Sequence, residues 1–275
     1  MARKDTLSVA IAQTASGPDI DKNIVRACSL VEHAVKSGAN LVALPETVDY
    51  RGDLKDLSSV AHPLPGPALE PFIALATSHQ VWILAGSVHE ANPDGGRPFN
   101  TSVLINPQGE MTAMYRKLHL FDITIGDRSV TESAKYTRGS AVVTADIDGW
   151  TAGLSICYDI RFPELYRAFA DRGVNLVFAP SSFTAPTGEA HWEILLRARA
   201  IENQCYVVAP GQAGIGAGRI ATYGNSMIVA PWGQVLARAS QDDDMVVIAD
   251  LDSTELETAK QKLPVLHHRR GDVFR

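Results

Sequence analysis

Short apolar runs alternate with segments of helical periodicity along almost the whole chain. Residues 19–36 carry Ile24, Ala27 and Val31 at helical spacing, and Gly38 ends that helix. Apolar runs that stop at Pro, Gly or Asn indicate buried strands. The pattern predicts strands over 7–12, 40–44, 81–88, 101–105, 111–116, 141–147, 151–156, 175–180, 206–209, 226–229, 235–238 and 245–250, and helices over 19–36, 67–79, 163–172, 189–203 and 253–262.

The order of these elements repeats. The segment 38–45 (GANLVALP) resembles 173–180 (GVNLVFAP), and each follows a predicted helix. Downstream, 106–109 and 230–233 each lie between two predicted strands. Two similar halves favour an α/β fold with four layers, an internally pseudo-symmetric α/β/β/α sandwich.

No linker-like stretch divides the chain, so we expect one domain over residues 1–275. The longest segments without a predicted element are 118–140 and 210–223. Long loops in compact domains are usually functional. The sequence does not say whether the 118–140 segment closes over a site.

Charge and composition exclude several classes of protein. Of 275 residues, 25 are Lys or Arg and 31 are Asp or Glu, a formal net charge of −6. This dispersed negative charge argues against nucleic acid or an anionic membrane as the main partner. The tail residues 267–270 (HHRR) supply too few ligands for a metal site and too few cations for a nucleic-acid patch.

Cysteine usage and hydropathy favour a cytoplasmic protein. Cys28, Cys157 and Cys205 are odd in number and lie far apart, which disfavours disulfides and a cysteine metal site. No run of 18 apolar residues predicts a membrane span, and 7–12 is interpreted as a first strand rather than a signal peptide.

Three residues at predicted strand ends are candidates for chemistry. Cys157 follows an apolar strand and precedes a polar turn and a helix, a good position for a nucleophile. Glu46 ends an apolar run, where a carboxylate suits a general base. Lys117 begins a loop and is suited to stabilising negative charge on a substrate oxygen. Each position also has a plain explanation: a small buried thiol for Cys157, and solvated side chains for Glu46 and Lys117.

Taken together, the three motifs resemble those of the nitrilase superfamily, the carbon–nitrogen hydrolases. The segments 44–46 (LPE), 115–122 (YRKLHLFD) and 157–165 (CYDIRFPEL) match its glutamate, lysine and cysteine motifs in order. Segments 180–193, 197–208 and 223–227 are typical of its Nit amidase branch. The resemblance implies that Glu46 is the base, that Cys157 is the nucleophile, and that Lys117 and the backbone N–H of Tyr158 hold the oxyanion. It further suggests that Lys117 lowers the pKa of the Cys157 thiol.

The resemblance also implies a second glutamate, at Glu132 in 131–133 (TES), that orients Lys117 or the substrate. The flanks depart from the usual pattern: Thr131 stands where relatives carry an aromatic or similar residue, and the later turn is Arg138-Gly139. This difference leaves substrate choice open. A solvated loop position is the alternative for Glu132.

Substrate-binding residues are implied by the same comparison. In Nit relatives the arginine matching Arg161 binds a substrate carboxylate, together with groups matching Phe183 and Thr187. Guanidinium forms bidentate pairs with carboxylates, which makes this role chemically reasonable. The alternative is that Arg161 forms an ion pair with Asp159 or Glu164. Tyr50 is a further candidate for the wall of the pocket.

The sequence therefore predicts hydrolysis of a small linear amide that bears a carboxylate, often with an α-keto group, and release of ammonia. We expect no cofactor and no metal. The resemblance implies a homodimer or higher oligomer, with a C-terminal tail at about 263–275 in the subunit contact. Alternatives are an N-carbamoyl amino-acid hydrolase or a nitrilase of the same superfamily, and a non-catalytic binding protein that keeps the fold.

Overall fold

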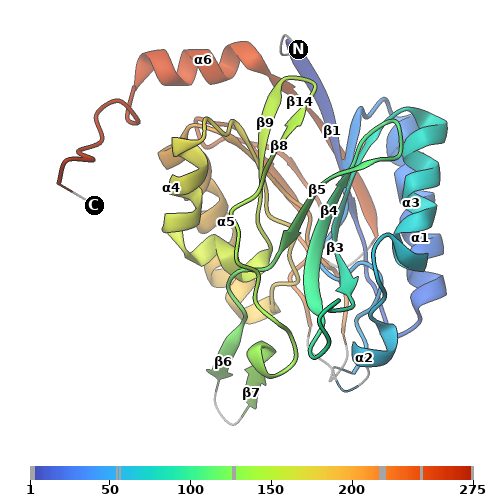
Figure 1. The fold of residues 1–275 in the computed structure, drawn as a ribbon. Helices are drawn as coiled ribbons and strands as arrows, with labels where there is room; N and C mark the ends of the chain where they lie inside the picture. The colour runs from blue at the N-terminus through green and yellow to red at the C-terminus, as the bar shows by residue number, and fades with distance from the viewer. Residues whose placement is uncertain are drawn as a thin grey trace.

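Two six-stranded sheets, with helices on their outer faces, form the body of the molecule in a computed structural model (Figure 1). The structure describes residues 4–53, 55, 57–125, 128–216, 221–241 and 244–273. The strands are β1 Thr6–Gln13, β2 Leu41–Ala43, β3 Trp82–Glu90, β4 Phe99–Ile105, β5 Met111–Arg116, β6 Asp122–Ile125, β7 Arg128–Thr131, β8 Thr144–Ile147, β9 Trp150–Leu154, β10 Leu176–Phe178, β11 Tyr206–Ala209, β12 Met227–Val229, β13 Val235–Arg238 and β14 Met245–Asp252. The helices are α1 Ile20–Lys36, α2 Leu57–Val60, α3 Gly66–His79, α4 Pro163–Asp171, α5 Ala185–Asn203 and α6 Ser253–Lys262, with short 3-10 helices η2 Glu132–Ala134 and η3 Cys157–Arg161.

The two sheets share one topology. The first has the order β14-β1-β2-β3-β4-β5 and the second β13-β12-β11-β10-β9-β8. In each, three parallel strands form the centre (β1-β2-β3 and β9-β10-β11), and antiparallel strands flank them. The repeated segments 38–45 and 173–180 lead into the equivalent strands β2 and β10. The predicted pseudo-symmetric α/β/β/α sandwich is confirmed.

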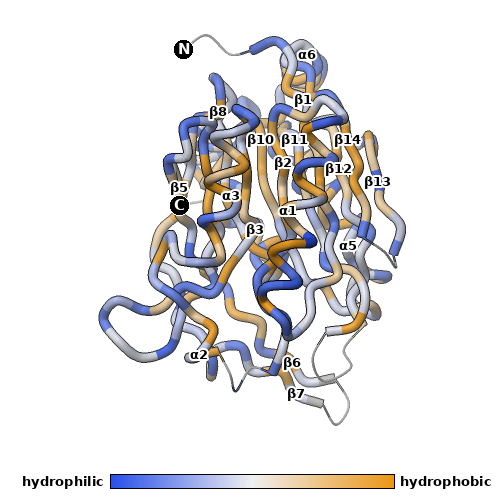
Figure 2. The backbone as a smooth tube through the Cα atoms, turned by 90° about the vertical axis from the view of Figure 1, so that its right-hand side faces the viewer, coloured by the Kyte–Doolittle hydropathy of each residue, from blue (hydrophilic) through white to orange (hydrophobic). Residues whose placement is uncertain are grey.

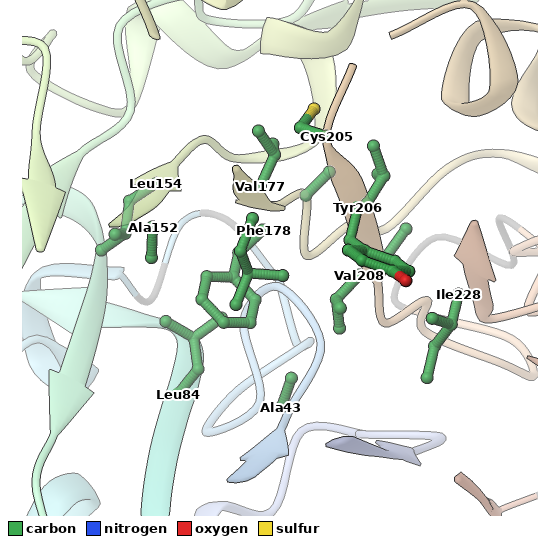
Figure 3. Packing of buried hydrophobic residues seen from close by; sticks show 14 of the residues in the cluster. Ala43, Leu84, Ala152, Leu154, Val177, Phe178, Cys205, Tyr206, Val208 and Ile228 are labelled. Carbon is green, nitrogen blue, oxygen red and sulfur yellow. The ribbon is translucent and has the colours of Figure 1, made fainter. Parts of the chain in front are cut away.

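Alternation along the strands divides the core into layers. In β1, Val9 and Ile11 join a cluster between the sheets, whereas Ala10 and Ala12 face a second cluster with α1 and α3. Figure 3 shows Ala43 and Leu84 of the first sheet pointing toward Phe178 of the second. Side chains from α4 and α5, such as Phe169 and Trp192, cover the other face of the second sheet.

The strands at the centre of the sheets are hydrophobic along most of their length, while α1 alternates between hydrophobic and hydrophilic turns (Figure 2). Central strands of this kind are buried on both faces by their neighbouring layers. Among the described residues, no helix is long and apolar enough to cross a membrane.

Several predicted boundaries differ from the structure, and helix α2 was not predicted; two of the differences bear on the site. The 118–140 segment is not irregular throughout: it holds the β6–β7 hairpin and η2. These strands have four residues each, and only β6 (DITI) alternates polar and apolar residues, over too short a stretch to predict a hairpin. Helix α5 begins at Ala185 rather than 189, because Pro186 lies in its first turn, where a missing N–H costs nothing.

Candidate active site

Four residues predicted from three separated motifs and one loop come together at one end of the sandwich. Lys117 Nζ lies 2.9 Å from Glu46 Oε1 and 2.9 Å from both carboxylate oxygens of Glu132. Glu46 lies three residues beyond β2, Lys117 directly after β5, and Cys157 three residues beyond β9. β2 and β5 run in the same direction and end at one edge of the first sheet. The hydrogen bond from Ser182, which follows β10, to Glu46 brings the carboxyl ends of β10 and its parallel neighbour β9 to the same place.

Glu46 is held in one orientation by hydrogen bonds from neighbouring strands. Its Oε1 accepts from Asn100 Nδ2 at 2.9 Å as well as from Lys117, and its Oε2 accepts from the backbone N–H of Ser182 at 2.8 Å. Its side chain is 5% exposed. The alternative of a solvated Glu46 is therefore wrong, because this carboxylate is buried and held in one orientation by its hydrogen bonds.

Lys117 lies between the two carboxylates. Burial alone would lower the pKa of its ammonium, but Glu132 and Glu46 outweigh burial and hold that pKa well above its usual range. Burial raises the pKa of Glu132, and the nearby charge of Glu46 adds to the rise, against the lowering effect of Lys117. Glu132 also accepts a hydrogen bond from the backbone N–H of Phe121, which ties the carboxylate to the β6–β7 segment.

Cys157 sits at the first position of η3 with φ of 49°, in the left-handed region that residues other than glycine rarely adopt. Its N–H donates to the carbonyl of Pro180 at 2.8 Å, which pins the turn against the loop after β10. Burial raises the pKa of the Cys157 thiol well above its ordinary value, and the Glu46 carboxylate adds to this rise. Lys117 does act to lower the thiol pKa, as the sequence suggested, but the other two effects are larger.

Asp159 joins the cysteine motif to the lysine motif. Its carboxylate is fully buried and accepts from Tyr115 Oη at 2.7 Å and from the Ile156 N–H at 2.8 Å. It also accepts from the N–H of His119 at 3.0 Å and lies 2.7 Å from His119 Nδ1. Through these contacts the Asp159 side chain fixes the position of the loop that carries Cys157 relative to the loop that carries Lys117.

A cavity of about 610 Å³ opens over this cluster. All four predicted substrate-binding residues line it, namely Tyr50, Arg161, Phe183 and Thr187, and so does Tyr158, the predicted oxyanion donor.

The contacts of Arg161 favour a ligand-facing role over the ion-pair alternative. Its Nη1 lies 3.1 Å from His191 Nδ1, and its guanidinium stacks over the Phe183 ring at 5.1 Å from the centroid. No carboxylate of the described residues lies within ion-pair distance of it. The predicted pair with Asp159 or Glu164 does not form.

The remaining predicted wall residues are held by local contacts. Thr187 Oγ1 lies 2.8 Å from Thr184 Oγ1, and the buried Phe183 ring packs on Trp192. Tyr50 is buried, and its hydroxyl donates to the carbonyl of Asp53 at 3.2 Å.

Several residues of the site escaped sequence reasoning. Arg51 is buried in the cavity wall and bonds the carbonyl of Ala213 and the side chain of Gln212; burial lowers its pKa to about 10. Asn100 donates a hydrogen bond to Glu46, and Asp159 joins the loops that carry Cys157 and Lys117. Asn100 lies just before the predicted strand 101–105 and is followed by two more polar residues, Thr101 and Ser102, so its sequence context did not single it out.

The part of the chain that the structure describes holds no group of three or more His, Cys, Asp or Glu side chains placed to bind a metal ion.

Comparison with known proteins adds to this geometry. A deaminated glutathione amidase of Synechocystis sp. is 41% identical over 276 residues, which cover 97% of this chain and 98% of that protein. An omega-amidase of Mus musculus is 35% identical over 270 residues, which cover 98% and 97% of the two chains.

The nitrilase and fragile histidine triad fusion protein NitFhit of Caenorhabditis elegans is 38% identical over 97% of this chain, but this chain spans only 61% of that protein. Its crystal structure matches with a TM-score of 0.92 at 38% identity and covers 100% of this chain and 67% of that chain. The carbon–nitrogen hydrolase family profile matches residues 8–261. The chain therefore belongs to the carbon–nitrogen hydrolase family, as the three motifs predicted.

Proposed function

We propose that this chain is an amidase that uses Cys157 as its nucleophile. The observation that carries the proposal is the buried Glu46–Lys117–Glu132 cluster with the Cys157 thiol against it, under an open cavity. The raised pKa of that thiol means that it keeps its proton until a base removes it. Glu46 is the buried carboxylate within reach.

The reaction runs in two halves. Glu46 takes the thiol proton while the sulfur of Cys157 adds to the amide carbonyl, and the carbonyl electron pair moves to oxygen. The tetrahedral species collapses, the C–N bond breaks, and Glu46 gives its proton to the leaving nitrogen. Water then adds to the thioester with its proton passing to Glu46. The C–S bond breaks, the carboxylic acid leaves, and Glu46 returns the proton to the sulfur of Cys157.

Lys117 and the backbone N–H of Tyr158 stabilise the oxyanion in both halves. Lys117 carries a charge secured by two carboxylates, which makes it a fixed cation rather than a proton donor. The N–H of Tyr158 lies in the first turn of η3, where amides have no acceptor within the helix. Glu132 keeps Lys117 in place when Glu46 becomes protonated.

The substrate is a linear amide with a carboxylate. Arg161 over Phe183, with Thr187 beside it, offers a guanidinium for that carboxylate. Buried Arg51 adds a second positive charge to the wall. The relatives named deaminated glutathione amidase and omega-amidase favour these two substrate classes. Ammonia is the product only where the amide nitrogen carries no further substituent; otherwise an amine leaves.

A panel of amides tests the proposal: α-ketoglutaramate, deaminated glutathione, glutaramate, an N-carbamoyl amino acid and an aliphatic nitrile. Ammonia, free amine and carbon dioxide are measured for wild type, Cys157→Ala and a control, Cys28→Ala, whose thiol lies on α1 away from the cavity. We expect one carboxylate-bearing amide to dominate, with activity lost only in Cys157→Ala.

Other outcomes assign other functions. Carbon dioxide from the carbamoyl substrate identifies an N-carbamoyl hydrolase, and turnover of the nitrile alone identifies a nitrilase. No turnover of any compound, with a folded protein, contradicts the proposal and favours a binding protein that keeps the fold.

We also propose self-association, as a homodimer or higher oligomer. Ile194 and Ile201 on α5 are 70% and 46% exposed, and Leu263 at the start of the tail is 48% exposed. Apolar side chains gathered on one helix are typical of subunit contacts. Sedimentation of wild type and Ile194→Glu tests this; a monomeric wild type contradicts it. Cytoplasmic location stays a prediction from the three free cysteines.

A further inference from the structure

One wall of the cavity holds polar groups that the proposed reaction does not use. Tyr136, which follows η2, and His89, near the end of β3, both line the cavity and are each 3% exposed. Asp49, three residues after Glu46, lies behind them and is 1% exposed.

Asp49 fixes the His89 ring. Its Oδ1 accepts from the N–H of Tyr50 at 2.9 Å and lies 2.9 Å from His89 Nδ1, while its Oδ2 accepts from the N–H of His89 at 2.9 Å. The His89 ring stacks on Tyr136 with centroids 5.9 Å apart and an interplanar angle of 27°. The Tyr50 ring also contacts His89 in a T-shaped arrangement, with centroids 5.8 Å apart and an interplanar angle of 78°. The Tyr136 ring is thus held in one position.

The Tyr136 hydroxyl has no hydrogen-bond partner among the described residues. The hydroxyl oxygen keeps some exposure to solvent, and since Tyr136 lines the cavity, that exposure is to the cavity. A hydroxyl that is open to the cavity and has no protein partner can donate its hydrogen bond to a ligand that enters there.

Charge decides what kind of partner fits. Burial raises the pKa of Tyr136 well above 10.0, and the carboxylates of Glu132, Asp49 and Glu46 add to the rise. The hydroxyl therefore keeps its proton and acts as a donor. Three carboxylates and one cation, that of Lys117, lie near the hydroxyl. This net negative charge disfavours an anion beside it, so the acceptor that fits is a neutral oxygen.

Building on the proposed function, we propose that the Tyr136 hydroxyl donates a hydrogen bond to a neutral keto oxygen on the acyl chain of the substrate. Tyr136 is then a specificity-determining residue, and His89 and Asp49 are positioning residues that hold its ring. The carboxylate of the same substrate lies elsewhere in the cavity, toward the guanidinium groups.

Binding of two small acids tests the inference without turnover. The dissociation constants of 2-oxoglutarate and glutarate, which differ only in the keto oxygen, are measured by calorimetry in the Cys157→Ala protein. We expect the keto acid to bind roughly tenfold tighter, and this ratio to fall to about one in Cys157→Ala/Tyr136→Phe. Cys157→Ala/Tyr206→Phe is the control, since Tyr206 Oη bonds Glu255 away from the cavity.

Three results overturn the inference: equal affinity for both acids in Cys157→Ala, equal weakening of both by Tyr136→Phe (as for a residue that holds a water), or no binding of either. Because amide turnover by wild type judges the proposed function, failure of one is distinguishable from failure of the other.

A double-mutant cycle tests the positioning role. His89→Asn in the Cys157→Ala background should lower the ratio several-fold with an unchanged Tm, and should have no further effect once Tyr136 is Phe. A ratio unmoved by His89→Asn shows that His89 does not act through Tyr136.

Discussion

At the scale of single residues, burial gives ordinary side chains their chemistry. Lys117 is 2% exposed in its side chain and sits against two carboxylates, so it carries a permanent and immobile charge. Cys157 is a thiol whose proton is hard to lose, beside a carboxylate placed to take it. Neither property belongs to the residue type; both come from the neighbours that the fold supplies.

Lys117→Ala tests the oxyanion role. We expect turnover of the best amide to fall ~100-fold or more, since removing such a donor usually costs that much. Lys260→Ala, which removes a lysine paired only with Glu257 on α6, is the control and should be neutral. Steady-state kinetics with circular dichroism to confirm folding gives the answer; turnover within a few-fold of wild type shows that Lys117 does not hold the oxyanion.

The thiols should be unreactive in the resting protein. Burial raises the pKa of Cys28 to about 11 and of Cys205 to about 12, and the pKa of Cys157 is also raised well above its ordinary value. Because the thiolate is the reactive form, we expect all three to react with Ellman's reagent at pH 8 at least ~10-fold more slowly than free cysteine. Unfolding in guanidinium should restore the rate. A native thiol that reacts as fast as free cysteine contradicts the burial argument.

At the scale of elements, strand ends and the turns after them build the site. Cys157 follows β9 in a left-handed turn, and Glu46 and Thr47 follow β2 in a similar way, with Thr47 at φ of 52°. The two turns follow different strands of the repeat, since β2 is equivalent to β10 and β9 to β1. The register of β3 shifts between Ala85 and Val88, which lets the chain pass close to the loop that carries Glu46.

Gly86, within that shift, has no room for a side chain. A Cβ there would occupy the space of the Leu44 carbonyl oxygen and lie 2.7 Å from Pro180 Cβ. The backbone of Leu44 would have to shift to make room for the added Cβ. We therefore expect Gly86→Ala to lower the free energy of unfolding by about 3 kcal/mol or more. Gly17→Ala, with no atom within 4 Å of its added Cβ, should change stability by less than about 0.5 kcal/mol. Urea unfolding measures both; equal stability of the two variants disproves the packing argument.

At the scale of the whole molecule, two sheets share one core while their outer faces pack on helices. This arrangement buries many groups that ionise only at alkaline pH, including Cys205, Tyr166 and Tyr206, and burial raises the pKa of each. The molecule therefore carries a pH dependence that follows from its packing rather than from its surface charge.

Stability should fall above pH 9. The Cys205 thiol has a pKa of about 12 in the folded protein and 9.0 as an ordinary thiol in the unfolded chain. Its contribution to the free energy of unfolding is therefore fully present below pH 9.0 and is lost as pH rises toward about 12. Between pH 9 and 10 a fully buried thiol costs up to ~1.4 kcal/mol of unfolding free energy. Urea midpoints at pH 8, 9 and 10 measure the slope, and Cys205→Ala should flatten it. An unchanged midpoint over this range contradicts the burial of these groups.

How much of the molecule follows from sequence differs between its parts. Apolar periodicity determined nearly every central strand and helix, because burial of one or both faces leaves a regular pattern in the chain. The repeat of 38–45 at 173–180 determined the two-fold plan. Three motifs at predicted strand ends were enough to identify the family and to nominate Glu46, Lys117 and Cys157.

Only the tertiary structure decided the rest. The β6–β7 hairpin has strands of only four residues, and β7 (RSVT) has no apolar alternation, so the local pattern is too short to predict it. Asp159, Asp49, His89 and Tyr136 act through contacts between segments far apart in the chain, such as Asp49 with His89 at a separation of 40 and Tyr115 with Asp159 at a separation of 44. The pKa of Cys157 depends on the balance between burial, Glu46 and Lys117. That balance cannot be predicted from the spacing of residues along the chain. Sequence determines which faces must be buried; the packing of those faces determines which polar groups meet.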